Sequence, residues 1–141
     1  MLKLTPDIHN AIKSHAAATY PFEGCGLLLG RAGDDQNVVE AIFPTPNTWP
    51  QAAEKRIRFL ISSADMLQAE MTAISQGLDV VGVFHSHPDC EPVASPRDLA
   101  WAAWPGYSYL ITQVSAGVPA LSRSWQLLSD RSGFVEEKIL E

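Results

Sequence analysis

One stretch of the sequence decides the fold: Leu78-Asp-Val-Val-Gly-Val-Phe-His-Ser-His-Pro88. From Leu78 to Phe84 every residue except Asp79 is apolar or glycine, and three of them are valines. A short run that is apolar on both faces and rich in β-branched residues is typical of a central strand covered on both sides. Pro88 is expected to end this strand, because proline has no N–H to donate to a sheet ladder.

The segments on both sides of this strand predict a sheet flanked by helices. Apolar or alternating runs indicate further strands at residues 25–30, 38–43, 56–61, 107–114 and 121–128, with a weaker last element at 134–140. Prolines and capping residues indicate helices at 6–19, from Ser62 to about Gly77, and from Ser95 onward. The expected fold class is therefore α/β (α+β), with one domain over residues 1–141 and a mixed sheet flanked by helices.

Several apolar side chains in these elements are expected to pack in a core. The helix after Ser62 carries a group of apolar residues on one side, namely Met66, Leu67, Met71 and Ile74. Trp101 and Trp104 lie three positions apart in the next helical segment, a spacing more typical of core packing than of ligand binding. Cys25, inside an apolar run, is expected to act as a small core hydrophobe.

The composition excludes several classes of protein. The 141 residues are 46% hydrophobic, which is enough for a core and excludes intrinsic disorder. No apolar run approaches the roughly 20 residues of a membrane span, and we expect no secretory signal at the start of the chain. The formal charge of −6 argues against a nucleic-acid partner. Two cysteines are too few for a disulfide framework, so a cytoplasmic location is expected.

The end of the decisive strand carries two histidines that predict a metal site. Residues two apart on a strand point to the same face, so His85 and His87 can present both imidazoles to one point. Imidazole is a preferred zinc ligand, and a catalytic zinc typically takes three protein ligands and one water. Asp98 is the natural third ligand, because it lies on the first turn of the next helix, where the loop can fold back over the strand end.

An ordinary structural interpretation of the same residues must be weighed. Ser95-Pro-Arg-Asp98 is also a common helix start, in which the Ser95 hydroxyl caps the helix and the Asp98 carboxylate complements the exposed amides. Taken alone, that interpretation is preferable for these two residues. The full spacing of two histidines, Ser95 and Asp98 favours the metal site, and a capping serine can also face a metal.

The string His85-Ser-His87-Pro followed by Ser95-x-x-Asp98 resembles the signature of the JAMM (MPN+, Mov34/PAD-1) zinc metallopeptidases, in their short bacterial form. Pro21-Phe-Glu23-Gly-Cys25-Gly-Leu-Leu-Leu-Gly30 resembles an upstream segment of that family, and Asn47, Arg58-Phe59 and the spacing from Gly82 to His85 match weaker parts of its pattern. The resemblance implies a cytidine-deaminase-like architecture. It also implies one Zn²⁺ per chain on His85, His87 and Asp98 with water as fourth ligand, Glu23 as general acid/base and Ser95 as oxyanion stabiliser.

The resemblance also implies a substrate class. Relatives of this family cleave bonds at the C-terminus of ubiquitin-like β-grasp proteins, and short bacterial forms resemble hydrolases of sulfur-carrier proteins of the ThiS/MoaD type. The expected function is thus a metallopeptidase or isopeptidase that cuts after the Gly-Gly tail of such a partner and releases cysteine or another amine. Trp49, in the proline-rich loop 44–50, is the candidate for a substrate contact.

Three alternatives stay open at this point. A metal-free MPN scaffold is disfavoured because every ligand position is filled, and a DNA-associated RadC-like relative is disfavoured by the acidic charge. A nucleobase deaminase would need a Pro-Cys-x-x-Cys motif, which Cys25 and Cys90 cannot supply. Cys90 is expected to be an ordinary loop residue, and His9 and His15 are given no role.

Overall fold

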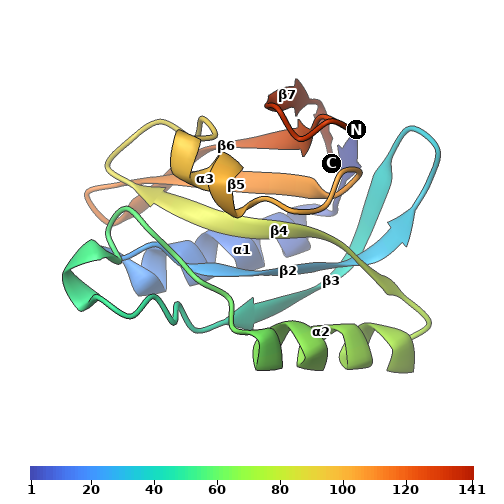
Figure 1. Cartoon of the computed structure of the whole chain (residues 1–141), viewed down its shortest axis with the longest axis horizontal. Coiled ribbons are helices and arrows are strands. Elements are labelled where there is room, and N and C mark those ends of the chain that lie inside the picture. Colours follow the sequence, from blue (N-terminus) through green and yellow to red (C-terminus); the bar gives the residue numbers. More distant parts are fainter.

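The computed structural model describes all residues, 1–141, and is built on one eight-stranded mixed sheet (Figure 1). The strands lie in the order β7-β6-β5-β4-β2-β3-β1-β8. Their bounds are β1 Leu2–Lys3, β2 Cys25–Ala32, β3 Asn37–Thr45, β4 Asp79–Pro88, β5 Ser108–Ser115, β6 Val118–Leu127, β7 Phe134–Glu137 and β8 Ile139–Leu140. β4 pairs antiparallel with β2 and parallel with β5, so the predicted central strand is confirmed.

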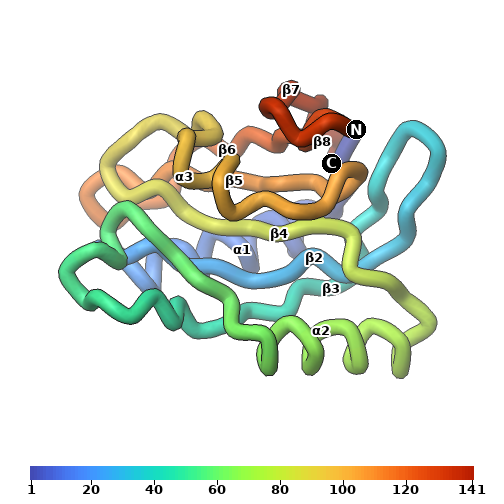
Figure 2. Tube along the Cα trace, viewed as in Figure 1, coloured from blue at the N-terminus to red at the C-terminus, as the bar shows by residue number.

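Three α-helices and one short 3-10 helix accompany the sheet. They are α1 Pro6–Thr19, the 3-10 turn Ala52–Glu54, α2 Ser63–Ser75 and α3 Pro96–Trp101. None of these helices is long and apolar enough to cross a membrane. The chain ends lie side by side (Figure 2), because β1 and β8 pair in parallel next to each other.

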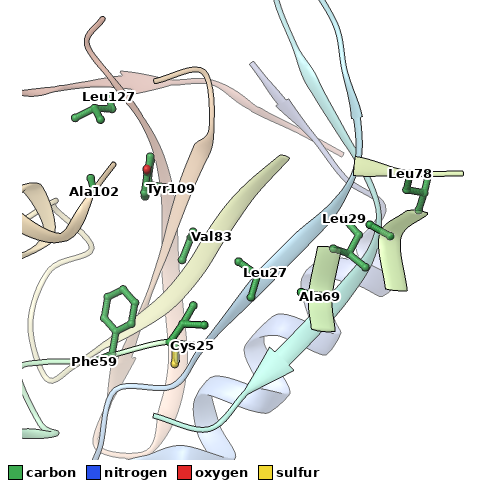
Figure 3. Packing of buried hydrophobic residues seen from close by; sticks show 12 residues of the cluster. Cys25, Leu27, Leu29, Phe59, Ala69, Leu78, Val83, Ala102, Tyr109 and Leu127 are labelled. Atoms are coloured by element: carbon green, nitrogen blue, oxygen red, sulfur yellow. The ribbon is translucent and has the colours of Figure 1, made fainter. Parts of the chain in front are cut away.

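Two buried clusters divide the apolar residues between the faces of the sheet. Ile12 of α1 packs in one cluster, together with Leu28 and Phe84 of the sheet. Ala69 of α2 packs in the other, together with Leu27 and Val83 (Figure 3). Ala73 of α2 belongs to the same cluster. Since side chains alternate along a strand, His85 and His87 follow Val83 onto the face that α2 and α3 cover.

The prediction of a strand at residues 56–61 is wrong. This segment is irregular and pairs with no strand. Phe59 and Ile61 do alternate inward and are buried, which explains the pattern in the sequence. The hydrogen bonds that a neighbouring strand would provide come from the loop 44–50. The Asn47 side chain donates to the Arg58 carbonyl and accepts from the Leu60 N–H, and Thr48 donates its N–H and its hydroxyl to the Leu60 carbonyl.

The helical predictions need two corrections. The apolar side of α2 faces outward over much of its length, since Leu67, Met71 and Ile74 are exposed and the helix packs through alanines. α3 ends at Trp101, so Trp104 lies outside it; Trp101 packs against the core cluster, whereas Trp104 stacks on Tyr107. The predicted Ser62 and Ser95 caps are both confirmed.

Candidate functional site

The register between β2 and β4 brings Glu23 beside the two histidines. Cys25 is paired with His85, and the pairing continues one residue further, where the Gly24 N–H donates to the Ser86 hydroxyl and the Ser86 N–H donates to the Gly24 carbonyl. Glu23 precedes Cys25 by two residues, and His87 follows His85 by two. Because the two segments run antiparallel, Glu23 lies across from His87. Opposite residues of an antiparallel pair share a face, so Glu23, His85 and His87 project to the same side.

The ligand atoms of His85, His87 and Asp98 converge on one point. All of them lie within 4.8 Å of one another. The two Nε2 atoms are 3.1 Å apart, and Asp98 places Oδ1 3.1 Å from His85 Nε2 and Oδ2 3.3 Å from His87 Nε2. Ligands held at 2.0–2.1 Å around a tetrahedral zinc ion are separated by about 3.3 Å. The spacing of these three side chains therefore fits such an ion.

The surroundings of His87 test whether a metal fits the chemistry of the donors. His87 Nδ1 lies 2.8 Å from the Glu91 carbonyl, which can only accept, so Nδ1 carries the proton. In the neutral ring Nε2 then presents a lone pair, and it faces the Asp98 carboxylate and His85 Nε2. The lone pairs of these atoms repel one another unless a proton on His85 Nε2 or a metal ion lies between them, so the donor set fits a cation.

The first turn of α3 orients the Asp98 carboxylate. The Asp98 N–H donates to Ser95 Oγ at 3.1 Å, and Asp98 Oδ2 accepts from the Ser95 N–H at 2.7 Å, which completes a capping box. Asp98 thus completes the helix start and at the same time faces the two histidines. For Ser95 the capping role is confirmed, and its hydroxyl donates no hydrogen bond in the structure.

Residues outside the predicted ligand set hold the site together. The Asn47 side chain donates to the carbonyls of Glu23 and Arg58, each at 3.0 Å, and so ties the loop 44–50 to the segment that precedes β2. Phe59 stacks on the His85 ring with centroids 4.5 Å apart. These contacts join residues that are distant in sequence, and the only sequence signal for them was the family pattern around Asn47 and Arg58-Phe59.

Burial and neighbouring charges shift the pKa values of these groups. Burial, and next the Asp98 charge, raise the pKa of Glu23 to about 8, against the lowering effect of His87 and Arg97. Burial works the other way on His85 and lowers its pKa. Burial also acts to lower the pKa of His87, but Asp98, the Glu91 carbonyl and Glu23 outweigh it and raise that pKa. Although burial opposes it, the histidines hold the pKa of Asp98 well below its usual range.

The raised pKa of Glu23 predicts how the stability of the metal-free protein depends on pH. Between about 4.5 and 8 the folded chain holds a proton on Glu23 that the unfolded chain releases, so the free energy of unfolding falls as pH rises through this window. Glu23→Gln removes this contribution, which is at most of the order of 5 kcal/mol. With zinc chelated, the variant is expected to match the wild type in Tm at pH 5 and to exceed it at pH 8.5. Parallel Tm curves for the two proteins would contradict the assignment.

A cavity of about 40 Å³ opens onto the cluster. Glu23 and Asp98 line it together with two arginines and four apolar or aromatic residues, namely Trp49, Ile57, Phe59 and Trp101. Trp49, the predicted substrate contact, therefore lies beside the candidate site. Cys90 is an exposed free thiol of the loop that joins β4 to α3, and Cys25 is fully buried as expected.

The comparison with protein families agrees with this geometry. Residues 5–128 match the family described as prokaryotic homologs of the JAB domain. The chain belongs to this family. A desampylase from Haloferax volcanii is 39% identical over 114 residues, which cover 78% of each chain. A probable TtuB-protein conjugate cleaving protease from Thermus thermophilus is 32% identical over 92 residues, which cover 65% of this chain and 57% of the relative.

Solved structures of other proteins share the fold. The solution structure of a Desulfitobacterium hafniense protein superimposes with a TM-score of 0.85 at 30% identity, covering 99% of this chain and 92% of the other. A JAB1/MPN domain protein from Archaeoglobus fulgidus has a TM-score of 0.59 at 18% identity, with 100% and 98% covered, and it supports the fold alone. The predicted JAMM/MPN family and fold class are both confirmed.

Proposed function

We propose that this prokaryotic JAB protein is a zinc-dependent isopeptidase that cuts after the C-terminal Gly-Gly of a ubiquitin-like or sulfur-carrier protein. The observation that carries the proposal is the convergence of His85, His87 and Asp98 beside the buried Glu23. His85 Nε2, His87 Nε2 and an Asp98 oxygen hold one zinc ion per chain. When bound, this ion supplies Lewis acidity and lowers the pKa of water toward 7.

The chain's own groups move the protons of the reaction. Glu23 takes a proton from the attacking water and delivers it to the leaving nitrogen as the amide C–N bond breaks, which leaves a glycine carboxylate and a free amine. Glu23 is 4% exposed, and its Oε1 has no hydrogen-bond partner in the protein, so this oxygen is free for water. The Ser95 hydroxyl proton, which no protein group accepts, faces the developing oxyanion.

The substrate class rests on the relatives. One is named as a desampylase and another as a protease that cleaves conjugates of TtuB with proteins, and both support a partner of the ubiquitin-like β-grasp class. We also propose that residues 1–141 act as one catalytic domain. Its free thiols, buried Cys25 and exposed Cys90, suit a reducing cytoplasm.

A panel of adducts tests the proposal. We expect the zinc-loaded protein to cut β-grasp carriers that end in Gly-Gly-cysteine or Gly-Gly-lysine just after the second glycine, as read by mass spectrometry. A carrier ending in Gly-Ala before the same extension is the matched control. If all Gly-Gly adducts stay intact while unrelated peptides are cut, the substrate class is wrong. If the protein never retains a metal, the scaffold alternative replaces the enzyme.

A further inference from the structure

Two arginines line the cavity that opens onto the candidate site. Arg58 and Arg97 line it together with Glu23 and Asp98. Arg97 lies on the first turn of α3, directly before Asp98, and its charge acts on Glu23. Its side chain is exposed and makes no ion pair or hydrogen bond within the protein. The mouth of the cavity therefore carries an unpaired positive charge.

Arg58 is held in place before any ligand arrives. Its guanidinium lies 4.9 Å from the centre of the Trp49 ring, and Nε is 3.4 Å from Glu54 Oε1 without the geometry of a hydrogen bond. The backbone is fixed as well, because the Arg58 carbonyl accepts from Asn47. A guanidinium that is already oriented loses little conformational freedom on binding, and its planar donors match a carboxylate.

The charge and size of the cavity define what these arginines can bind. Glu54 lies within ion-pair distance of Arg58, whereas no carboxylate forms an ion pair with Arg97, although Glu23 and Asp98 line the same cavity. A cavity of about 40 Å³ holds roughly three atoms of the size of water oxygen. A carboxylate has three heavy atoms and the required negative charge. The Gly-Gly tail itself is neutral, so such a group must come from the leaving side of the scissile bond.

We propose that Arg58 and Arg97 recognise the α-carboxylate of the leaving group, so that the preferred substrate is a Gly-Gly tail capped by a single amino acid with a free carboxyl end. In that adduct the carboxylate carbon is two bonds from the scissile nitrogen, within reach of the arginines beside Glu23. A lysine side-chain conjugate within a protein has no charge at this distance, because the lysine carboxyl is itself part of a peptide bond. This inference rests on the proposed function and narrows its substrate.

The experiment compares two carriers that differ in one group. A β-grasp carrier ending in Gly-Gly-cysteine is prepared with a free C-terminal carboxylate and with a C-terminal amide. For the wild type we expect kcat/KM to be about 10- to 100-fold higher for the acid, as for one charge-assisted hydrogen bond, with most of the difference in KM. Arg97→Gln is expected to abolish this preference and Arg97→Lys to restore part of it.

Two controls distinguish a failure of this inference from a failure of the proposed function. Arg31→Gln, at the other end of β2 and paired with Glu40, is expected to keep the full preference for the acid. Zinc content should be equal in all variants, because neither Arg58 nor Arg97 is among the proposed ligands. Equal cleavage of acid and amide by the wild type would overturn this inference alone. Failure to cut any Gly-Gly adduct would overturn the proposed function, and this inference with it.

Discussion

Glu23→Gln protein is expected to retain about one zinc per chain and to lose turnover by about 10²- to 10⁴-fold, the usual contribution of a general acid/base. Glutamine keeps the shape of the side chain but cannot take a proton from water. Because Glu23 is not among the three converging ligands, metal binding should not change. The measurement is kcat on a Gly-Gly adduct together with zinc per chain by elemental analysis.

A matched control for this variant is Glu40→Gln. Glu40 is an exposed glutamate of β3 that pairs with Arg31, so its loss should leave turnover unchanged. Unchanged turnover in Glu23→Gln would assign the proton transfers to another group. Loss of zinc in the same variant would instead make Glu23 a ligand and remove it from the acid/base role.

Asp98→Ala is expected to lose both zinc and activity. The carboxylate contacts both histidines, at 3.1 and 3.3 Å, and without it two neutral imidazoles are left to hold a divalent cation. In the wild type, zinc added to the metal-free protein should raise Tm, because a ligand that binds only the folded state stabilises it. In Asp98→Ala this rise should disappear. Elemental analysis and thermal melts with and without zinc provide the measurements.

Asp65 of α2 provides a matched control for the Asp98→Ala variant. Asp65 occupies the same position after a capping serine as Asp98 does, since its N–H donates to Ser62 Oγ, but no histidine lies beside it. Asp65→Ala should therefore show the cost of altering a helix start, about 1 kcal/mol, without any effect on zinc. Full zinc content in Asp98→Ala would show that Asp98 acts only in its capping box.

Local patterns predicted most of the fold because each depends on neighbours in the chain. The central strand ending in the two histidines, the caps at Ser62 and Ser95 and the outer strands are all local signals. For the segment 56–61 the local pattern wrongly predicted a strand. Its alternation is real, but a strand also needs a partner with a free edge, and here Asn47 and Thr48 supply the hydrogen bonds to its backbone instead.

The outward-facing apolar side of α2 shows a second limit of prediction from the sequence. Apolar periodicity predicts that a helix has a face to bury, but it does not say which face meets the sheet. In α2 the small side chains of Ala69 and Ala73 allow close approach to the core, and the larger Leu67 and Met71 remain exposed. Close packing of backbone elements decided the orientation, and this depends on the shape of the opposing surface.

By itself, the sequence determined that His85 and His87 share a face, because the two-residue period of a strand is a local property of the backbone. It also determined that Ser95 and Asp98 begin a helix. Only the tertiary structure decided that Asp98 meets the histidines, that Glu23 lies across from His87 and that Arg58 and Arg97 line the same cavity. These relations join segments separated by loops, and their geometry follows from strand register and packing, which no local pattern encodes.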